Sequence, residues 1–324
     1  MRRRDFIGLL GGAATVGSGA WPAPVRAQGK IPRIGYFWND FPDPNVGLAG
    51  LRQGLQERGY VLGRNLLLEE RYAEGDPSRA RELIAELLAL GVDVLVTGDF
   101  ALIQAHTLTA TVPIVGVAGD FVGVGLAAKL SRPGGNVTGL SMLSAELSPK
   151  WLELLQAAVP NLNRVAFLGG FSGLTAEEKR GLDQAAPRFH VTLTQLDLYR
   201  ANFEASLEAI TSESFDGLIV SGESDAESLI PRIVAHAAQS RMPTIYGIST
   251  AVRQGGLMSY SADSFELWRR AAGYIDRILK GAKPGDLPIE QATAIKFAIN
   301  LKTAKALGLD IPPTLLAAAD EVVE

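Results

Sequence analysis

The chain repeats one α/β pattern twice, and this repeat constrains its fold more than any single residue does. Three short apolar strands are expected at 33–37, 92–96 and 112–117, and each has a counterpart about 130 residues later, at 164–168, 215–220 and 242–247. Asp is second in both middle strands, and Pro is second in both last strands. Two such lobes leave a cleft between their strand ends, where small ligands usually bind. We therefore predict two Rossmann-like α/β lobes with parallel sheets around a ligand cleft.

Helices are predicted between these strands from their caps and their apolar periodicity. Asp76-Pro77 begins a helix that ends at Gly91, and Ser148-Pro149 predicts the start of a second helix. Further helices are expected at about 44–58 and 264–280. Continuous apolar strands that alternate with helices are typical of a parallel sheet covered on both faces.

The order of the elements predicts how the chain is divided. A strand at 256–260 has no counterpart in a simple tandem repeat, so we expect the chain to cross between the lobes through a multi-strand hinge. Several short crossings permit hinge closure around a ligand. The predicted division is an export signal at 1–27, lobe 1 at 28–141, lobe 2 at 142–256, a return to lobe 1 at 257–290, and a hinge strand and C-terminal helix on lobe 2 at 291–324.

The first 27 residues have the features of a targeting segment. A basic start is followed by a weakly apolar, Gly-rich stretch, and Val25-Arg26-Ala27 offers small residues for cleavage. The run Arg3-Arg4-Asp5-Phe6-Ile7 resembles a twin-arginine export signal. An uncleaved anchor is the alternative interpretation. We predict export, cleavage near Ala27 and a periplasmic location.

Composition limits the partners of the remaining chain. Loss of the first 27 residues removes four Arg and one Asp, so the formal net charge falls from −4 to −7. An acidic chain without a basic run is a poor candidate for binding nucleic acid or anionic membranes. No later run approaches the ~18–20 apolar residues of a membrane span, and there are no cysteines. We expect a monomer that does not itself span the membrane.

Motifs for catalysis are missing from the sequence. The histidines His106, His190 and His236 are far apart, and no nucleophile elbow, phosphate loop or calcium loop occurs. A glycine-rich turn at 168–173, with Asp197 after it, has the layout of a dinucleotide site, but Leu168 stands where a glycine is needed. Backbone amides that hold a ligand carboxylate are the favoured use of this turn. We therefore predict no catalytic residue, no cofactor and no metal.

Residues at the carboxyl ends of the predicted strands form the candidate binding site, because these ends converge on one crevice in a parallel sheet. The set combines acids, hydroxyls, glycines and aromatics without Lys or Arg, which suits an amino acid or another small amine-bearing or polyhydroxy solute. Asp99 and Glu223 are the leading polar contacts, one per lobe. Helix capping for Asp40, Asp99 and Asp120, and plain packing for Trp38 and Phe100, are the alternatives. The candidates are Trp38, Asn39, Asp40, Gly98, Asp99, Phe100, Gly119, Asp120, Gly170, Phe171, Ser172, Gly222, Glu223 and Tyr246.

Several longer strings resemble one family of ABC-transporter substrate-binding proteins. They are Arg132-Pro133-Gly134-Gly135-Asn136-Val137-Thr138-Gly139, Gly255-Gly256-Leu257-Met258-Ser259-Tyr260, and the tail strings at 278–288 and 299–313. The resemblance extends over essentially the whole chain. It implies a type I periplasmic binding protein, with two lobes joined by three crossovers, that presents a solute to an ABC permease in the inner membrane. Because the family includes tryptophan-binding members, the resemblance makes an amino acid the first expectation for the ligand.

Two other functions are compatible with the same sequence. An exported enzyme on this fold is one, since twin-arginine export often carries cofactor-loaded proteins. A ligand sensor for a signalling receptor is the other. The loop at 38–43 lacks the Ser-Pro pair common in the family, so the resemblance indicates the class of protein and leaves the ligand open.

Overall fold

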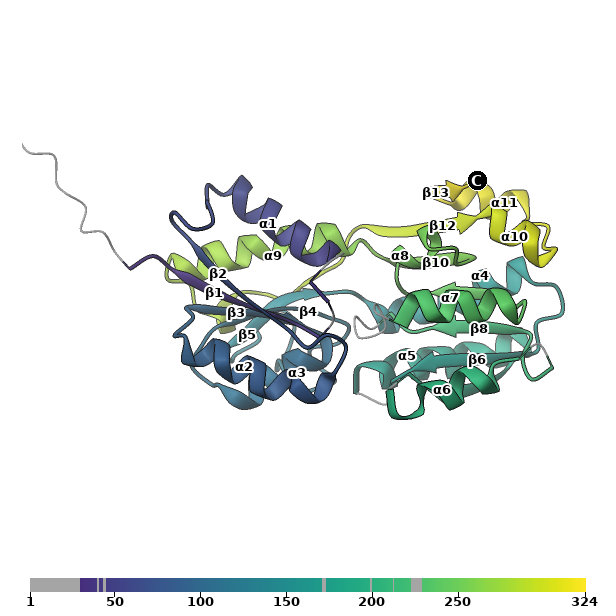
Figure 1. Cartoon of the computed structure of the whole chain (residues 1–324), viewed down its shortest axis with the longest axis horizontal. Coiled ribbons are helices and arrows are strands. Elements are labelled where there is room, and N and C mark those ends of the chain that lie inside the picture. Colours follow the sequence, from purple (N-terminus) through teal and green to yellow (C-terminus); the bar gives the residue numbers. More distant parts are fainter. Residues whose placement is uncertain are drawn as a thin grey trace, which may run out of the picture. The chain divides into compact units, whose positions relative to one another are not determined.

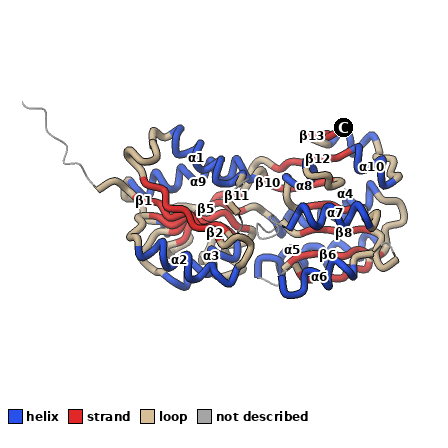
Figure 2. Tube along the Cα trace, in the orientation of Figure 1, coloured by secondary structure: helices blue, strands red, loops and turns tan. Residues whose placement is uncertain are grey.

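The structure is a computed structural model of the whole chain. It describes residues 30–39, 41–42, 45–170, 173–198, 200–211, 213–222 and 229–324. Residues 32–324 form one compact unit. Two separate β-sheets lie within this unit, and Figure 2 shows their strands as two groups.

The first sheet has six parallel strands in the order β11-β5-β4-β3-β1-β2. Every residue of β3, β4 and β5 is buried, as expected for strands covered on both faces. The strands are β1 (Arg33–Trp38), β2 (Leu67–Tyr72), β3 (Val94–Gly98), β4 (Ile114–Ala118), β5 (Val137–Ser141) and β11 (Glu290–Gln291).

The second sheet has seven strands in the order β13-β12-β10-β9-β8-β6-β7. It is parallel except where β12 runs antiparallel to β10. The strands are β6 (Arg164–Gly169), β7 (Thr192–Asp197), β8 (Gly217–Val220), β9 (Thr244–Tyr246), β10 (Met258–Ala262), β12 (Ile295–Asn300) and β13 (Glu321–Val323).

Helices cover both faces of the first sheet (Figure 1). α1 (Val46–Glu57) and α9 (Ser264–Leu279) pack on one face, and α2 (Ala80–Ala89) and α3 (Asp99–Leu108) pack on the other. Two 3-10 turns, at Pro77–Arg79 and Pro284–Asp286, accompany them. Glycines bring α1 and α9 together, because a Cβ on Gly50 or Gly54 would collide with backbone carbonyl oxygens of α9.

The second sheet is also covered on both faces. One apolar core joins α4 (Ser144–Ala158) and α5 (Gly173–Ala185) to α10 (Leu301–Leu307) and α11 (Pro313–Ala318). The core on the opposite face is made by the remaining helices, α6 (Arg200–Ala209), α7 (Ile230–Gln239) and α8 (Thr250–Arg253). A 3-10 turn, Ala186–Phe189, follows α5. The sheet, helix and core assignments together give two α/β lobes, as the sequence predicts.

The chain passes between the two sheets three times, after β5, after β10 and after β11. Hydrogen bonds join the crossing segments to each other. The Ala292 N–H donates to the Ser141 carbonyl at 2.8 Å, and the Asp263 N–H donates to the Ala294 carbonyl at 3.0 Å. Three crossings bonded in this way form one hinge rather than three independent linkers.

Two local expectations need correction. α4 begins at Ser144, so Pro149 lies inside the helix and Ser148 is not its cap. The Ser148 hydroxyl instead donates to the backbone carbonyl of Glu178 at 2.9 Å, which ties α4 to α5. Strand β10 pairs with β9 and β12, so the second sheet continues past residue 256, and the elements on the first sheet resume with α9.

Candidate functional site

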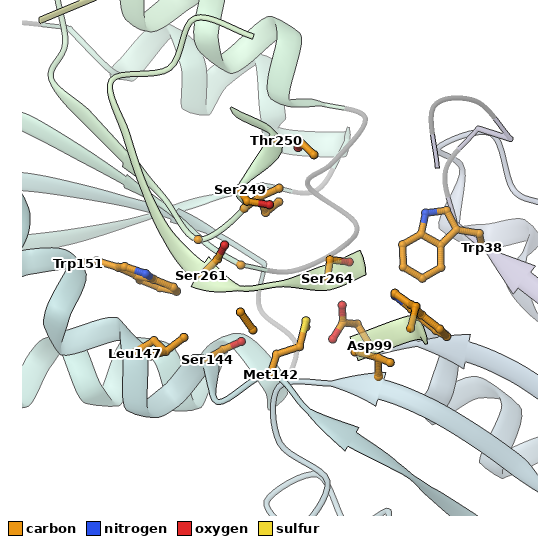
Figure 3. A pocket seen from close by; sticks show the side chains of 16 residues that line it. Trp38, Asp99, Met142, Ser144, Leu147, Trp151, Ser249, Thr250, Ser261 and Ser264 are labelled. Atoms are coloured by element: carbon orange, nitrogen blue, oxygen red, sulfur yellow. The ribbon is translucent and has the colours of Figure 1, made fainter. Parts of the chain in front are cut away.

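A cleft between the two sheets is the candidate binding site. It contains about 630 Å³ of space, part of it open to solvent. Residues from both lobes and from two crossings line it (Figure 3). They are Trp38, Asp99, Val117, Met142, Ser144, Leu147, Trp151, Gly222, Gly247, Ile248, Ser249, Thr250, Ser261, Ala262, Ser264 and Trp268.

An aromatic cluster forms the first-lobe end of the cleft. Trp38 ends β1, stacks on Tyr36 at 6.1 Å between ring centroids, and meets Trp268 of α9 edge to face at 5.6 Å. Gly98 lets these rings approach the backbone, since a Cβ there would lie 3.2 Å from Trp38 Cζ3. Trp38 is 7% exposed, so packing holds its indole in one orientation. The cluster forms an aromatic wall of the cleft.

Asp99 is the charged side chain of the cleft among the described residues that line it. It is 2% exposed and is the first residue of α3, where the helix dipole favours a negative charge. Its backbone is left-handed, with φ at 42°. A non-glycine residue held in this conformation costs about 1–3 kcal/mol, and such strain clusters at binding sites. The carboxylate therefore has the placement of an acceptor for an ammonium group.

Trp151 of α4 forms the opposite end of the cleft (Figure 3). Its indole N–H donates to the Tyr260 carbonyl at 2.6 Å, which fixes the ring against β10. Gly222 and Gly247 follow β8 and β9, and Gly247 leaves room for this ring. A Cβ on Gly247 would lie 2.7 Å from Trp151 Cζ2 and 2.6 Å from the Gly222 Cα. Glycine at position 247 is therefore required by the position of the indole and by the close approach of the Gly222 backbone.

Hydroxyl groups line a third part of the cleft. Ser249 and Thr250 lie at the start of α8, Ser261 lies on β10, and Ser264 begins α9. In Figure 3 these four side chains lie on one side of the pocket, across from Leu147 and Met142. No Lys or Arg is among the described residues that line the cleft. The cleft thus combines one carboxylate, neutral hydroxyls and flat apolar walls, which suits a ligand with an ammonium group and a ring.

The structure brings some of the predicted site residues together. Trp38, Asp99 and Gly222 line the cleft, and Gly98 lies directly behind the aromatic cluster. These four residues come from the ends of three parallel strands, β1, β3 and β8. Ligand contact by these residues stays a prediction.

Other predicted residues do not line the cleft in the part of the chain that the structure describes. The Asp120 carboxylate accepts hydrogen bonds from the backbone N–H groups of Val122 and Gly123, both at 2.9 Å. Tyr246 is buried in the second lobe, where burial raises the pKa of its hydroxyl. The others outside the cleft are Asn39, Phe100, Gly119 and Gly170. For these residues ligand contact stays a prediction.

Four predicted residues, Asp40, Phe171, Ser172 and Glu223, lie outside the described residues. The structure therefore does not describe the leading second-lobe contact or residues 171 and 172 of the glycine-rich turn. Gly170, the described end of that turn, is buried, and its carbonyl accepts a hydrogen bond from Gln195 Nε2 at 3.3 Å.

Sequence reasoning missed the residues that the crossings contribute. Met142, Ser144 and Leu147 follow the first crossing, and Ser261, Ala262, Ser264 and Trp268 surround the second. The prediction considered only strand ends, whereas a cleft at a hinge is also lined by the segments that connect the lobes. The strand 256–260, which had no counterpart in the repeat, was the signal that a crossing lies there.

A second cavity lies beside the cleft. It contains about 840 Å³, partly open to solvent, and it shares Ser249 and Thr250 with the cleft. Two ion pairs line it: Lys296 Nζ lies 2.8 Å from Asp263 Oδ2, and Arg253 bonds Glu321 with two contacts of 3.0 Å. The start of α8 therefore separates the two cavities.

The described part of the chain contains neither a metal site nor a membrane-spanning helix. It contains no group of three or more His, Asp or Glu residues placed to coordinate a metal ion. Within the same residues, no helix has both the length and the apolar character needed to cross a bilayer.

Two α/β lobes, a hinge of three crossings and a cleft lined from both sides define a bilobal solute-binding protein. The sequence profile of the family described as ABC transporter substrate binding protein matches residues 45–323. The chain belongs to this family. The family and its structural neighbours are solute-binding proteins, and the fold is that of periplasmic binding proteins.

Three relatives illustrate the similarity. A tyrosine-binding protein of Clostridioides difficile (strain R20291) is 23% identical over 274 residues, which cover 83% of this chain and 79% of the relative. The structure of an ABC domain from Streptococcus pneumonia in complex with L-Trp is 26% identical, with a TM-score of 0.83, over 91% of this chain and 100% of that one. A conserved domain protein of Vibrio cholerae has the same identity and TM-score, over 90% of this chain and 100% of that one.

Proposed function

We propose that this protein is the solute-binding component of an ABC importer and that its ligand is an amino acid with an aromatic side chain. The observation that carries the proposal is the composition of the cleft, which is lined by three tryptophans and one carboxylate. Aromatic walls favour a ring, and the Asp99 carboxylate favours an ammonium group. A polyanionic ligand is disfavoured, since no cationic side chain is among the described residues that line the cleft.

Relatives support the same ligand class. One is named a tyrosine-binding protein, and another was crystallised with L-Trp. Both ligands combine an ammonium group with a planar ring, the two groups that Asp99 and the tryptophans of this cleft can contact. At identities of 23% and 26%, the choice between tyrosine, tryptophan and phenylalanine is left to experiment.

Capture by lobe closure is the proposed mechanism. A ligand held by Asp99 and Trp38 on one side and by Trp151 on the other contacts both lobes. A ligand shifts an open–closed equilibrium by its difference in affinity for the two states, and a difference of a few kcal/mol is sufficient. The three crossings are the proposed hinge, and the two lobes, each built on one of the two sheets, are proposed to move as separate bodies.

The proposed setting is the periplasm, with an inner-membrane permease as the partner. The basic start, the weakly apolar stretch and the small residues before Gln28 support export and cleavage near Ala27. A monomer is proposed, because one chain supplies both sides of the cleft. N-terminal sequencing of the exported protein tests the cleavage position.

Isothermal titration calorimetry on the chain from residue 28 onward tests the ligand class. We expect L-tryptophan, L-tyrosine or L-phenylalanine to bind at one site per chain, and L-leucine, L-glutamate and glucose to bind at least tenfold more weakly. A higher affinity for glucose or L-glutamate than for every aromatic amino acid would contradict the proposed ligand class.

A further inference from the structure

Two hydroxyl groups of the cleft are buried without a hydrogen-bond partner. Thr250 Oγ1 and Ser261 Oγ have no partner among the described residues, and the Ser261 residue is only 5% exposed. Both residues line the cleft, and they come from different elements, α8 and β10. In Figure 3 they lie on the same side of the pocket. Two unsatisfied donors thus line the same side of the binding site.

Unsatisfied buried hydroxyls cost free energy, so a folded protein retains few of them without a use. Each hydroxyl can donate one hydrogen bond and can turn its hydrogen toward an incoming acceptor. A side chain as small as Ser or Thr also changes rotamer at little cost when the site rearranges around a ligand. The pair is therefore suited to an acceptor that arrives with the ligand.

The charge of the cleft identifies this acceptor. Asp99 can neutralise a ligand ammonium, but no cationic side chain is among the described lining residues to neutralise a ligand carboxylate. A carboxylate in this cleft must therefore be held by neutral donors. Carboxylates accept up to about four hydrogen bonds, and bonds to an ionised acceptor are roughly twice as strong as neutral ones.

We infer that Thr250 and Ser261 form a carboxylate subsite, which makes the protein select α-amino acids over the amines that carry the same ring. The inference rests on the proposed function and specifies the ligand further. Asp99 then takes the ammonium at the first-lobe end, while the carboxylate lies against α8 and β10. Ser261 is two residues before Asp263 at the second crossing, so the ligand carboxylate is held beside the hinge.

Ser259 supplies a matched control on the same strand. It lies two residues before Ser261 on β10, so both side chains leave the same face of the strand. Its hydroxyl is also buried without a partner among the described residues. Ser259 lines the second cavity and not the cleft. Removal of the Ser259 hydroxyl therefore measures how loss of an unsatisfied serine hydroxyl on β10 affects ligand affinity when that hydroxyl does not line the cleft.

The test compares each amino acid with its amine by calorimetry on the chain from residue 28 onward. The pairs are L-tryptophan with tryptamine, L-tyrosine with tyramine, and L-leucine with isoamylamine. We expect each amine to bind at least tenfold more weakly than its amino acid. Ser261→Ala and Thr250→Val should each lower amino-acid affinity about tenfold and leave amine affinity unchanged. Ser259→Ala should change neither affinity.

The outcomes separate this inference from the proposed function. If an amine binds as tightly as its amino acid, or if Ser261→Ala lowers both affinities equally, the carboxylate subsite is wrong while the aromatic ligand class stands. The pair of L-leucine and isoamylamine tests the case in which the subsite is correct and the aromatic ligand class is wrong. If L-leucine binds best and still shows the loss in Ser261→Ala, the aromatic ligand class is wrong and the subsite stands. Binding of no member of any pair overturns both.

Discussion

The indole of Trp38 meets the indole of Trp268 edge to face, with ring centroids 5.6 Å apart and ring planes at 79°. One ring ends the first strand of the chain and the other lies on the helix that follows the second crossing. Their contact joins the start of the first lobe to the segment that returns to it. The same contact builds the aromatic wall of the cleft, so folding of the return segment and formation of the site depend on each other.

Removal of the Trp38 ring should weaken binding of aromatic amino acids. Trp38→Leu keeps an apolar side chain but removes the aromatic face, which is worth about 0.5–1.5 kcal/mol beyond its buried area. We expect the affinity for an aromatic amino acid to fall about tenfold, as measured by calorimetry. Trp38→Phe keeps a ring and should lose clearly less. Equal losses in both variants would show that the ring face does not contact the ligand.

Asp99→Asn should weaken binding of every ligand that carries an ammonium group, because it replaces a charge-assisted hydrogen bond with a neutral one. We expect a loss of about tenfold or more in calorimetric affinity. Asp120→Asn is the matched control, because its side-chain oxygen caps a turn outside the cleft lining and Asn can still accept those bonds. A larger effect at Asp120 than at Asp99 would place the ammonium site elsewhere.

Gly247→Ala should damage the second-lobe end of the cleft. The added Cβ would lie 2.5 Å from the Gly222 nitrogen and 2.7 Å from Trp151 Cζ2, so backbone and indole must both move. We expect a loss of about 1–3 kcal/mol in the free energy of unfolding, measured by urea denaturation, together with weaker ligand binding. Gly135→Ala is the control, since a Cβ there meets nothing within 4 Å. Unchanged stability in Gly247→Ala would show that the Trp151 indole and the Gly222 backbone can move to accommodate the added Cβ without cost.

The ion pair between Asp263 and Lys296 should make stability depend on pH at the hinge. Burial opposes ionisation of Asp263, but hydrogen bonds from the Lys296 ammonium and from backbone N–H groups outweigh it, and the pKa of the carboxyl lies below its ordinary value of 3.8. A carboxyl with a lowered pKa stabilises the folded chain above its ordinary pKa, and this contribution is lost as the pH falls through the lowered value.

Asp263→Asn tests this pH dependence. Asn still caps α9. We expect the variant to be less stable than the parent at neutral pH by up to about 1 kcal/mol, since Lys296 is largely exposed. The difference should shrink as the pH falls below 3.8. Asp286→Asn breaks the exposed Arg132–Asp286 pair and serves as the control. A stability difference that does not change with pH would assign the effect of Asp263 to capping alone.

Much of the fold could be predicted from the sequence, because the repeated strands carry strong local signals. Strands such as β3 and β8 are short apolar runs that begin directly after an Asp, a pattern that is local in the sequence. The helix start at Asp263-Ser264 is likewise local, because the Asp263 carboxylate accepts from the Glu266 N–H at 3.1 Å. Such signals need no knowledge of the tertiary structure.

Half of the cleft could not be predicted in this way. Trp151 lies on the apolar face of α4, where its spacing is the same as that of the core leucines around it. Only the crossing after β5 turns this helix so that the indole reaches the cleft. Ser261 and Thr250 are similar cases. The sequence does not show that their hydroxyls are buried without a hydrogen-bond partner, and only the structure reveals this. Long-range packing determines which of these residues line the cleft, and the pattern of a single sequence contains no information about that packing.

The placement of the tryptophans makes the intrinsic fluorescence of the protein a direct reporter of the cleft. The full sequence has four tryptophans, and one of them, Trp21, belongs to the predicted leader. After cleavage near Ala27, every remaining indole, at Trp38, Trp151 and Trp268, lines the cleft. The entire tryptophan emission of the processed chain therefore originates at the binding surface, and a non-fluorescent ligand can be followed by quenching or spectral shift without an added dye.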